Sequence, residues 1–540
     1  MAKFIFVTGG VLSGLGKGVT ASSIALLLKK RGYKVFMQKF DPYINIDPGT
    51  ISPYQHGEVF VTYDGAETDL DLGHYERFID VELNKTSNIT TGKIYSSVIE
   101  KERNGEYSGS TVQVVPHITN EIKNKIKEAA DSSGADIVIT EIGGTIGDIE
   151  SLPFIETIRQ FRQETGKENS LFIHTTLIPY IYGSYELKTK PTQHSVADLR
   201  SFGIQPDILV CRTPKELDQS IINKLALYCS VDSKAVIEAI DVKNIYEIPI
   251  NFYNQKLDEI VCEYLNIRAK KINLREWYEL IDTVNNLNSS VTIGLVGKYV
   301  ELHDAYLSVK EALIHAGYKF HTKINIEWIS SELLKKEENM NQIFKNVDGI
   351  IVPGGFGVKD IKGEMNAIKY ARENNIPFFG ICLGMQLACI EFAQNVCNIS
   401  DANSKEFDEQ TKNPIIDLML ETKKINQLNS TLRLGNYPCT IIKNTKAHEY
   451  YKKVNIQERH RHRYEFNNKY INLFEQKGMI FSGMNNEKKL VEIIELENHK
   501  CFIGCQFHPE FKSRPTKPHP LFEFFIKTSI ENKCKEKNVI

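Results

Sequence analysis

The stretch KFIFVTGGVLSGLGKGVTASSIALLLKKRG, residues 3–32, decides the fold. It opens with a short apolar run that ends in glycines and continues into a helix-like segment over 20–32, and a second apolar run follows over 34–41. Strand, helix and strand in this order are typical of a parallel sheet with helices on both faces. The same rhythm returns later, over 135–144, 205–212 and 234–241. The sequence therefore predicts an α/β, doubly wound fold.

A second α/β series begins with VTIGLVGKY, residues 291–299, and continues through apolar runs over 349–357, 377–384 and 489–511. Between the two series, the amphipathic stretch LREWYELIDTV predicts a linker helix, and the polar NNLNSS predicts an irregular connection. We therefore expect two doubly wound domains, over 1–267 and 291–540, joined by a linker over 268–290.

Composition excludes several function classes. The chain of 540 residues is 41% hydrophobic and 25% charged, as expected for a globular protein of two or more domains. A net charge of −2 gives no overall attraction to nucleic acid or membranes. Ten dispersed cysteines without a C-x-x-C pair suggest neither a zinc site nor a disulfide framework, which fits the reducing cytoplasm. We expect no signal peptide and no membrane span.

The glycine-rich TGGVLSGLGKGVTASS, residues 8–23, lies where the first strand gives way to the first helix. Glycines let the backbone wrap an anion, and the helix N-terminus supplies free N–H donors. The strict G-x-x-x-x-G-K-[ST] pattern is not met, because Val11 replaces the first glycine and Gly18 replaces the magnesium-binding hydroxyl residue. A tight structural turn is the alternative, but the flanking elements and Lys17 favour phosphate binding.

Any Mg²⁺ ligands must therefore come from other segments. Asp71 lies in the acidic ETDLDLGHYE, and Glu141 ends the apolar run DIVITE at the edge where such sheets bind ligands. Taken singly, each acid fits a surface or capping position equally well. Lys188 and Lys190 alternate in YELKTKPTQHS, and an extended backbone before Pro191 would point both ammonium groups the same way, toward a second phosphate ligand. A solvated loop is the alternative there.

The stretch PFFGICLGMQLA, residues 377–388, orders a strand, a turn and a helix around Cys382. Glycines two residues before and after the cysteine match a nucleophile elbow, and a helix N-terminus favours the thiolate. Read alone, Cys382 also fits a buried core thiol. The base is supplied by GCQFHPEF, where His508 and Glu510 would face the same side of an extended strand. The glycines of GIIVPGGFG leave N–H groups free for an oxyanion hole. Together these elements indicate acyl transfer, with Cys389 and Cys397 structural.

The stretch ERHRHRYEFN, residues 458–467, is locally basic. Read alone, it fits a solvated loop or a loop that touches nucleic acid, but without a wider basic patch we do not expect nucleic-acid binding. Arg463 could instead pair with a carboxylate ligand.

The chain resembles the CTP synthase family over nearly its whole length. The resemblance lies in the motifs already quoted and in KFDPYINIDPGT, SPYQHGEVFVTYDGAETDLDLGHYERF, TVQVVPHITNEI, EIGGTIGDIESLPF, KTKPTQHSV, VPGGFG, GICLGMQ, RHRHRYE and CQFHPEF. The motif GICLGMQ marks any class I glutamine amidotransferase, whereas GAETDLDLGHYERF and KTKPTQHSV are more specific. The family implies a P-loop-like amidoligase domain followed by a flavodoxin-like class I glutamine amidotransferase domain.

The resemblance implies that Cys382 attacks the glutamine amide, that His508 carries the proton and that Glu510 orients the imidazole. Ammonia would travel inside the protein to the first domain, where ATP phosphorylates O4 of UTP and ammonia displaces the phosphate to give CTP. The residues that match the glutamine site are Tyr54, Gly355, Leu383, Gly384, Met385, Gln386, Glu406 and Arg463.

The nucleotide sites are implied in the same way. The ATP site matches Gly14, Leu15, Gly16, Lys17, Gly18, Val19, Lys39, Asp71, Asp241 and Val242. The UTP/CTP site matches Ser13, Asp148, Ile149, Glu150, Lys188, Thr189, Lys190, Pro191, Thr192, Gln193 and Lys224, and Mg²⁺ would be held by Asp71 and Glu141.

The family also implies CTP as feedback inhibitor, GTP as activator of glutamine hydrolysis, and a homotetramer with the UTP site at subunit contacts. This sequence departs from the family pattern at Lys359-Asp360 and at residues 429–432, in loops that the family ties to the GTP response, and at Ile240 beside the adenine stretch.

Two other functions are compatible with parts of the sequence. An amidotransferase on a cobalamin-type acid joins similar domains, but the segment 188–193 argues against it. A filament-forming structural homologue with reduced turnover would have no need of Cys382, His508 and Glu510 together with Asp71 and Glu141.

Overall fold

The computed structural model describes residues 2–183, 185–356, 360–418 and 432–537. The chain forms two compact units. Unit 1 comprises residues 1–50 and 71–281, and unit 2 comprises residues 51–70 and 282–540. The chain thus passes from one unit to the other after residues 50, 70 and 281, whereas the sequence predicted one continuous first domain over 1–267.

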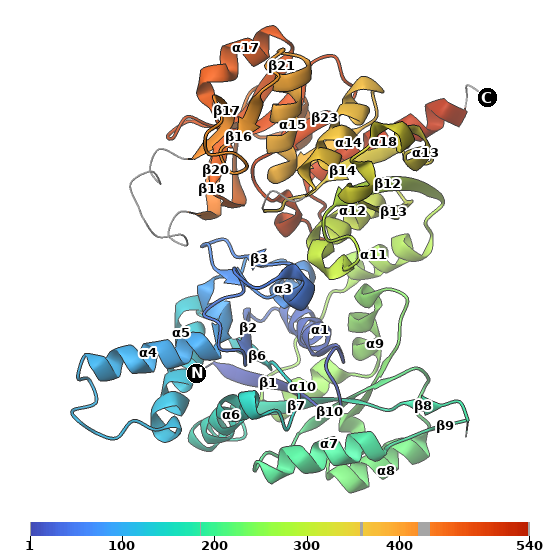
Figure 1. The fold of residues 1–540 in the computed structure, drawn as a ribbon. Coiled ribbons are helices and arrows are strands. Elements are labelled where there is room, and N and C mark those ends of the chain that lie inside the picture. Colours follow the sequence, from blue (N-terminus) through green and yellow to red (C-terminus); the bar gives the residue numbers. More distant parts are fainter. Residues whose placement is uncertain (1, 184, 357–359, 419–431, 538–540) are drawn as a thin grey trace. The chain divides into compact units, whose positions relative to one another are not determined.

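Unit 1 is built on a seven-stranded sheet in the order β11-β10-β7-β1-β6-β2-β5, and every neighbouring pair is parallel (Figure 1). The near-continuous burial of β1 and β2 is typical of a parallel sheet that is covered on both faces. The strands are β1 (Lys3–Gly9), β2 (Val35–Asp41), β5 (Asn88–Thr90), β6 (Ile137–Ile142), β7 (Ser170–Leu177), β10 (Ile208–Thr213) and β11 (Val236–Ile240).

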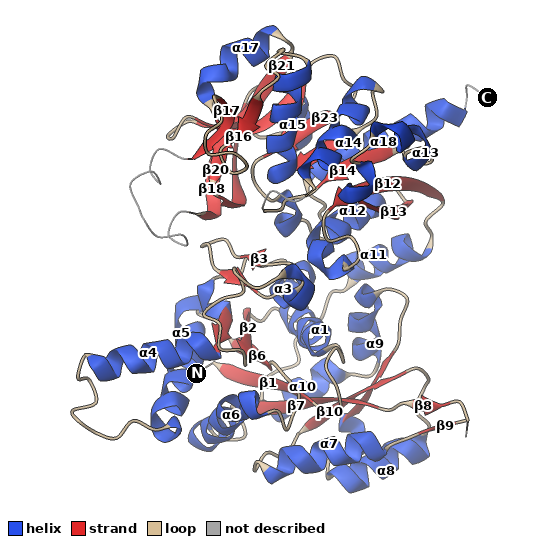
Figure 2. Ribbon diagram, in the orientation of Figure 1, coloured by secondary structure: helices blue, strands red, loops and turns tan. Residues whose placement is uncertain are grey.

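Helices cover both faces of this sheet (Figure 2). Phe4 and Phe6 of β1 contact Phe161 of α6 and share one core with residues of α4 and α5. Ile5 and Val7 point the other way, and α1 packs on β1, β2 and β6. The doubly wound prediction is confirmed. The helices are α1 (Lys17–Lys30), α3 (Asp71–Ile79), α4 (Thr91–Arg103), α5 (Thr119–Ser133), α6 (Leu152–Thr165), α7 (Lys190–Ser201), α8 (Gln219–Cys229), α9 (Ile248–Asn254), α10 (Leu257–Tyr264) and α11 (Arg275–Asn285).

A short hairpin of β8 (Tyr180–Ile181) and β9 (Glu186–Leu187) extends away from the sheet of unit 1 (Figure 1). Its connecting turn exposes two aromatic side chains, Tyr182 (79%) and Tyr185 (80%). Large aromatic side chains this exposed are uncommon in an isolated surface turn, and they are the kind of group that a protein interface covers.

Unit 2 contains a nine-stranded sheet in the order β13-β12-β14-β15-β23-β22-β21-β18-β19. Its first five strands are parallel, and the pairs from β23-β22 onward are antiparallel. The strands are β12 (Ser289–Gly297), β13 (Thr322–Ser330), β14 (Gly349–Val352), β15 (Phe378–Ile381), β18 (Arg433–Ile441), β19 (Asn455–His462), β21 (Met479–Asn485), β22 (Leu490–Leu496) and β23 (Phe502–Cys505).

Alternate side chains of this sheet enter two separate cores. Ile350 and Val352 of β14 join one core with α14 and α15, while Ile351 joins the other with α12 and α18. The helices are α12 (Leu307–Lys319), α13 (Met340–Ile343), α14 (Ile361–Glu373), α15 (Leu383–Asn395), α16 (Lys446–Tyr451), α17 (Ile471–Gln476) and α18 (Pro520–Lys537). A three-stranded sheet packs against α15; its strands are β16 (Ala402–Ser404), β17 (Asn413–Leu418) and β20 (Tyr464–Phe466).

Residues 51–70 belong to unit 2 although they come from the amino-terminal part of the chain. They form α2 (Pro53–His56) and a hairpin of β3 (Phe60–Val61) and β4 (Glu67–Thr68). The carboxylate of Glu58 accepts a hydrogen bond from the Ser308 amide at 2.7 Å, and the Arg459 guanidinium donates to the Val61 carbonyl at 3.0 Å. Buried polar contacts of this kind fix the segment to unit 2.

Within the described residues, no helix combines the length and the apolar character that crossing a membrane requires.

The start of α14 depends on a glycine. A Cβ atom added at Gly363 would lie 1.8 Å from the carbonyl oxygen of Ser331, a backbone atom that cannot swing away. We expect Gly363→Ala to lower the free energy of unfolding by about 1–3 kcal/mol, because α14 must shift to admit the methyl group. The unfolding midpoint on heating measures this effect. Lys362→Ala, an exposed change one residue earlier, is the control, and equal midpoints for the two variants would contradict the packing argument.

Candidate active sites

Cys382 lies between the end of β15 and the start of α15, with φ 51° and ψ −101°. Such a backbone conformation is strained for a residue with a side chain and is typical of a nucleophile elbow. The thiol is 3% exposed, and its Sγ atom lies 3.7 Å from Nε2 of Gln506. The arrangement of strand, turn and helix predicted around Cys382 is confirmed.

The two glycines around the cysteine are required by close packing. A Cβ atom at Gly384 would lie 2.1 Å from the Val352 carbonyl oxygen, and one at Gly380 would lie 2.7 Å from the backbone of Gly384. Only hydrogen fits at either position, because the facing atoms belong to the backbone. The glycines therefore let α15 approach β14 closely enough to hold the turn.

His508 and Glu510 are paired, with 2.7 Å between Nδ1 and Oε1. The predicted extended strand is wrong here, since β23 ends at Cys505 and a 3₁₀ turn over Pro509–Lys512 carries the glutamate. Proline after the histidine favours that turn, and the turn brings the carboxylate back to the ring. The contact was predicted, but its backbone geometry was not.

The histidine lies beside the thiol. A Cβ atom at Gly354 would be 2.6 Å from Cε1 of His508 and 3.5 Å from Cβ of Cys382, so one small backbone position adjoins both side chains. Burial alone would lower the pKa of His508, but the negative charges of Glu510 and Cys382 raise it to about 10. The site therefore favours a protonated imidazole at His508.

Two backbone N–H groups belong to segments near the turn at Cys382. Leu383 is the first residue of α15, so its N–H has no partner within the helix. Gly355, on the loop after β14, lies against the same leucine, since a Cβ atom there would be 3.3 Å from Leu383 Cδ2. Gly355 comes from the segment where the sequence predicted an oxyanion hole, and Leu383 directly follows the cysteine.

Three of the predicted glutamine-site residues interact with Tyr464. Gln386 donates hydrogen bonds to the Tyr464 carbonyl at 3.0 Å and to Gln506 at 3.2 Å. Burial raises the pKa of Tyr464, and the charge of Glu406 raises it further while that of Arg463 lowers it. Gln386 is joined to the thiol through Gln506, whereas the roles of Glu406 and Arg463 stay predictions.

Two predicted residues take other positions. Tyr54 is 55% exposed and packs edge to face on Tyr299, with 5.2 Å between ring centroids. No contact found among the described residues joins it to Cys382. Met385 points into the core, since a Cβ atom at Gly504 would be 3.0 Å from its side chain.

The basic stretch 458–467 is not a solvated loop, which was one of the alternatives that its sequence allowed. Residues Asn455–His462 form β19, with Arg459, His460 and His462 buried. Burial, together with the charge of the buried Arg433, holds the pKa of both histidines well below the usual range, so they stay neutral. The strand is polar in sequence because its side chains form an internal network behind the thiol.

Sequence reasoning also missed two residues of this site. Gln506 bonds both Cys382 and Gln386, and only its place in CQFHPEF could have indicated it. Arg461 pairs with Glu67 at 2.7 Å, and its carbonyl oxygen lies 3.9 Å from the Cys382 sulfur. The partner comes from the 51–70 segment, so spacing along the chain could not reveal it.

The glycine-rich loop of unit 1 has the geometry predicted for phosphate binding. Gly14 and Gly16 adopt positive φ values of 73° and 90°, and Lys17 is the first residue of α1. The Lys17 ammonium donates to the Gly144 carbonyl, and burial lowers its pKa although Glu141 opposes that shift. Left-handed glycines followed by a helix N-terminus are the backbone arrangement on which the prediction of phosphate binding rests, and that binding stays a prediction.

Gly18 explains the departure from the usual phosphate loop. A Cβ atom there would lie 3.0 Å from the Asp71 carboxylate and 3.2 Å from that of Glu141. Two carboxylates therefore occupy the space that a serine or threonine would fill. The sequence predicted both acids as substitutes for the missing hydroxyl, and the structure brings them together at this point.

The charges around Gly18 are strongly coupled. Lys39 forms an ion pair with Asp71, and its charge keeps the pKa of that carboxyl low although burial opposes it. Tyr75 donates a hydrogen bond to Glu141, whose pKa burial and the Asp71 charge raise to about 7. The half-buried Asp71 and the buried Glu141, whose charges repel each other, are a favourable pair for a divalent cation. No cluster of three or more acidic, histidine or cysteine ligands occurs in the described ranges.

The adenine stretch reaches the phosphate loop through Arg212, a residue that sequence reasoning missed. Arg212 lies one residue before the end of β10, pairs with Asp241 at 2.8 Å and donates to the Gly14 carbonyl at 2.9 Å. Val242, which follows Asp241 in the chain, is half-buried. A charged side chain at the carboxyl end of a parallel strand was the signal that could have indicated it.

The segment 188–193 lies beside the same loop, because a Cβ atom at Gly10 would overlap the Ser195 hydroxyl of α7. The predicted extended backbone is wrong. Thr189 has helical φ and ψ angles and α7 begins at Lys190, since proline is accepted in the first helical turn. Lys188 pairs with Glu186 instead of pointing alongside Lys190.

The other predicted UTP residues differ in exposure. Ser13, Asp148, Ile149 (79% exposed), Glu150, Lys190 and Lys224 reach the surface, whereas the hydroxyls of Thr189 and Thr192 are buried. Thr192 donates to the Leu177 carbonyl at 3.0 Å, and Gln193 donates to Thr189 at the same distance. Lys224 is on α8, which packs against α7.

Comparison with known proteins agrees with the expected family. Residues 3–267 match the family described as CTP synthase N-terminus, and residues 301–528 match glutamine amidotransferase class-I. CTP synthase of Bacillus subtilis is 59% identical over 531 residues, which are 98% of this chain and 99% of the relative. CTP synthase of Geobacillus kaustophilus is 58% identical, covering 98% and 100%.

One solved structure is the Trypanosoma brucei CTPS glutaminase domain with bound acivicin, 35% identical, covering 45% of this chain and 94% of that one, with a TM-score of 0.42. The identity to the bacterial relatives runs through both units and nearly the full length of each chain. This chain belongs to the CTP synthase family, the glutamine-dependent enzymes that make CTP.

Proposed function

We propose that unit 2 hydrolyses glutamine at Cys382 and that unit 1 uses the ammonia to aminate UTP at the Gly18 site. The observation that carries this assignment is the pair of carboxylates, Asp71 and Glu141, packed against Gly18 of the phosphate loop. An enzyme that only hydrolysed glutamine would have no use for them. The cobalamin-acid and structural alternatives have no observation in their favour.

Glutamine hydrolysis follows from the elbow. The Cys382 thiolate attacks the amide carbon, and the N–H groups of Gly355 and Leu383 stabilise the oxyanion. The His508 imidazolium, held by Glu510, gives its proton to the departing ammonia. Water then attacks the thioester with His508 as base, which releases glutamate and restores the thiol. Gln386, Glu406 and Arg463 would hold the amino acid end of the substrate.

In unit 1 the loop over Gly14–Gly18 would bind the phosphates of ATP, with Lys17 and Lys39 stabilising the charge that moves in phosphoryl transfer. The acceptor is O4 of UTP, and ammonia displaces the phosphate from C4 to give CTP. Asp71 and Glu141 fit Mg²⁺, a hard cation that binds one or two carboxylates together with phosphate oxygens and neutralises their charge. Asp241 and Val242 would contact adenine.

UTP and its product CTP would be held by the exposed residues around α7 and the loop over 145–150. We propose that CTP inhibits by occupying part of this site, that GTP activates glutamine hydrolysis, and that ammonia passes between the sites within the protein. Lys359 and residues 429–431, where the sequence departs from the family, lie outside the described residues. The exposed Tyr182 and Tyr185 support a homotetramer, and the reduced cysteines fit the cytoplasm.

The two-site assignment is tested first with Cys382→Ala. This variant loses the nucleophile, so we expect glutamine-dependent CTP formation to fall at least about 10³-fold while synthesis from ammonium continues at the wild-type rate. CTP formation from UTP, ATP and Mg²⁺ is measured with each nitrogen source. Cys534→Ala, which removes an exposed thiol, is the control and should retain both activities. Loss of both activities in folded Cys382→Ala would contradict the division between sites.

The role of Glu510 predicts a shift in pH dependence. Its charge raises the pKa of His508, so Glu510→Gln lowers that pKa and the imidazolium is lost at lower pH. The alkaline limb of glutamine hydrolysis should move to lower pH by about one unit or more, and kcat should fall about 10²–10⁴-fold. Glutamate release as a function of pH measures both. A slower enzyme with an unmoved alkaline limb would show that Glu510 acts only in packing.

The synthetase site is tested with Lys17→Ala and Asp71→Asn. Each should lower CTP formation by at least about 10²-fold with either nitrogen source, because phosphoryl transfer depends on charge stabilisation. Basal glutamine hydrolysis should remain. Lys34→Ala and Asp131→Asn, exposed changes in the same unit, are the matched controls. Normal ammonium-dependent turnover in either active-site variant would remove that residue from the proposal.

A further inference from the structure

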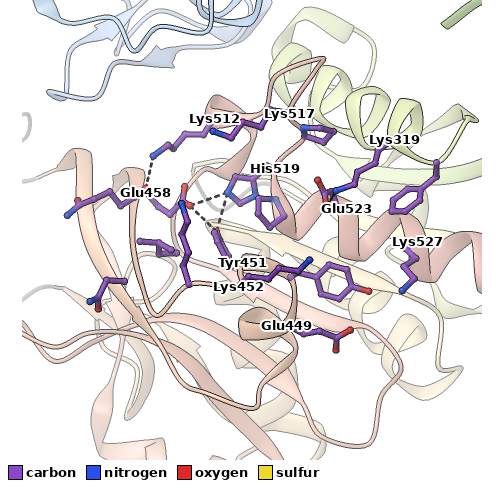
Figure 3. A pocket seen from close by; sticks show the side chains of 18 residues that line it. Lys319, Glu449, Tyr451, Lys452, Glu458, Lys512, Lys517, His519, Glu523 and Lys527 are labelled. Carbon is purple, nitrogen blue, oxygen red and sulfur yellow. Dashed lines mark hydrogen bonds and ion pairs between the residues drawn. The ribbon is translucent and has the colours of Figure 1, made fainter. Parts of the chain in front are cut away.

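Unit 2 contains a cavity of about 820 Å³ that is lined by none of the residues assigned above. It is bordered by the end of α12, by α16, by the start of β19 and by the first turns of α18 (Figure 3). Its volume lies within the range of small-molecule sites in proteins. Its charged lining consists of Lys319, Lys452, Lys453, Lys512, Lys517 and Lys527, and of Glu449, Glu458 and Glu523.

The lining is strongly positive for a chain that is slightly acidic overall. Six lysines against three glutamates give a formal charge of +3, whereas the whole chain carries −2. Two of the glutamates are already engaged. Glu523 pairs with Lys319 at 2.6 Å, and Glu458 accepts hydrogen bonds from Tyr451 at 2.9 Å and from His519 at 3.1 Å. The cavity therefore attracts anions.

Three of the lysines are available to a ligand. Lys452, Lys453 and Lys517 are exposed, and no ion pair or side-chain hydrogen bond of theirs is found in the described part of the chain. Lys452 also adopts the left-handed conformation, with φ 54°, that glycine or asparagine adopts more easily. Gathering like charges around one hollow is unfavourable unless an anion neutralises them.

The floor of the cavity is a rigid polar cluster. Glu458, Tyr451 and His519 bond one another and are buried (Figure 3). Burial would raise the pKa of Glu458, but the charge of His519 lowers it, so the carboxylate stays ionised and held. One of its oxygens, Oε1, accepts both of these hydrogen bonds, and the six lysines of the lining outweigh its single negative charge for an incoming anion.

The rest of the wall is apolar. Phe320, Tyr450, Ile456, Pro518 and Pro520 line the cavity beside the lysines. The volume exceeds what an inorganic phosphate or pyrophosphate needs, and rings and prolines offer flat surfaces for the organic part of a ligand. The combination fits a molecule that carries both clustered phosphates and an organic group.

We propose that this cavity is a binding site for a small organic molecule bearing two or more phosphate groups. Lys452, Lys453 and Lys517 contact the phosphates, and the wall of Phe320 and Tyr450 contacts the organic part. The proposal does not depend on the roles assigned to the two active sites. Nucleotides and sugar bisphosphates share the required chemistry, and the experiment distinguishes them.

The test is calorimetric titration of the full chain with pyrophosphate. The pocket variant carries Lys452→Glu, Lys453→Glu and Lys517→Glu. The control carries Lys345→Glu, Lys477→Glu and Lys489→Glu, three exposed changes of equal charge in the same unit. We expect wild type and control to bind one more pyrophosphate per chain than the pocket variant, or to bind it at least tenfold more tightly. Identical titrations for all three would overturn the proposal.

Two further experiments test whether the variants fold and which class of ligand binds. Replacing the same three lysines with arginine should retain binding, and glutamine hydrolysis by each variant reports an intact unit 2. Titration with ADP and with fructose 1,6-bisphosphate assigns the organic part, since the fitting compound should bind this site more tightly than pyrophosphate. If neither does, the organic part of the proposal is wrong. Citrate binding as tightly as pyrophosphate would overturn the preference for phosphate.

Discussion

The left-handed backbone at Cys382 is the constraint on which the amidotransferase unit depends. A side-chain-bearing residue with φ 51° is held there only because Gly380 and Gly384 let β15, β14 and α15 approach within backbone contact. That approach sets the sulfur at a helix N-terminus, beside backbone donors on one side and His508 on the other. The strain is local, and the surrounding parallel strands, which are among the most buried parts of the chain, counter it.

In unit 1 a glycine again makes room for the functional groups, but here these groups are two carboxylates beside a phosphate loop. Its phosphate loop gives up the usual hydroxyl, and Gly18 leaves room for two carboxylates that come from separate elements, α3 and β6. The positive charges of Lys17 and Lys39 offset the two carboxylates and so reduce their repulsion of nucleotide phosphates. In both units the reactive groups lie where strands end, so the sheet positions them and the loops supply their chemistry.

Much of this could be predicted from the sequence. The strand–helix–strand rhythm, the elbow at Cys382 and the partners His508 and Glu510 are local patterns with a physical reason at each position. The errors came where tertiary context prevailed. Residues 458–467 fit a solvated loop by their polarity, but they lie in two strands, β19 and β20, and several of their side chains are buried. Lys188 and Lys190 look extended because proline follows, yet the helix accepts that proline in its first turn. Arg212, Gln506 and Arg461 act through partners far along the chain, which spacing cannot reveal.

The placement of residues 51–70 in unit 2 has a consequence for how the protein is made. During synthesis this segment leaves the ribosome more than two hundred residues before its partners Ser308, Arg459 and Arg461. Unit 1 must therefore form its sheet while residues 51–70 have no partner yet. The polar groups that this segment later buries, Glu58 among them, stay hydrated until the rest of unit 2 has been made. Neither unit is a continuous piece of chain, so the folding of each unit depends on when the other is made. The two activities are therefore coupled during folding as well as through their chemistry.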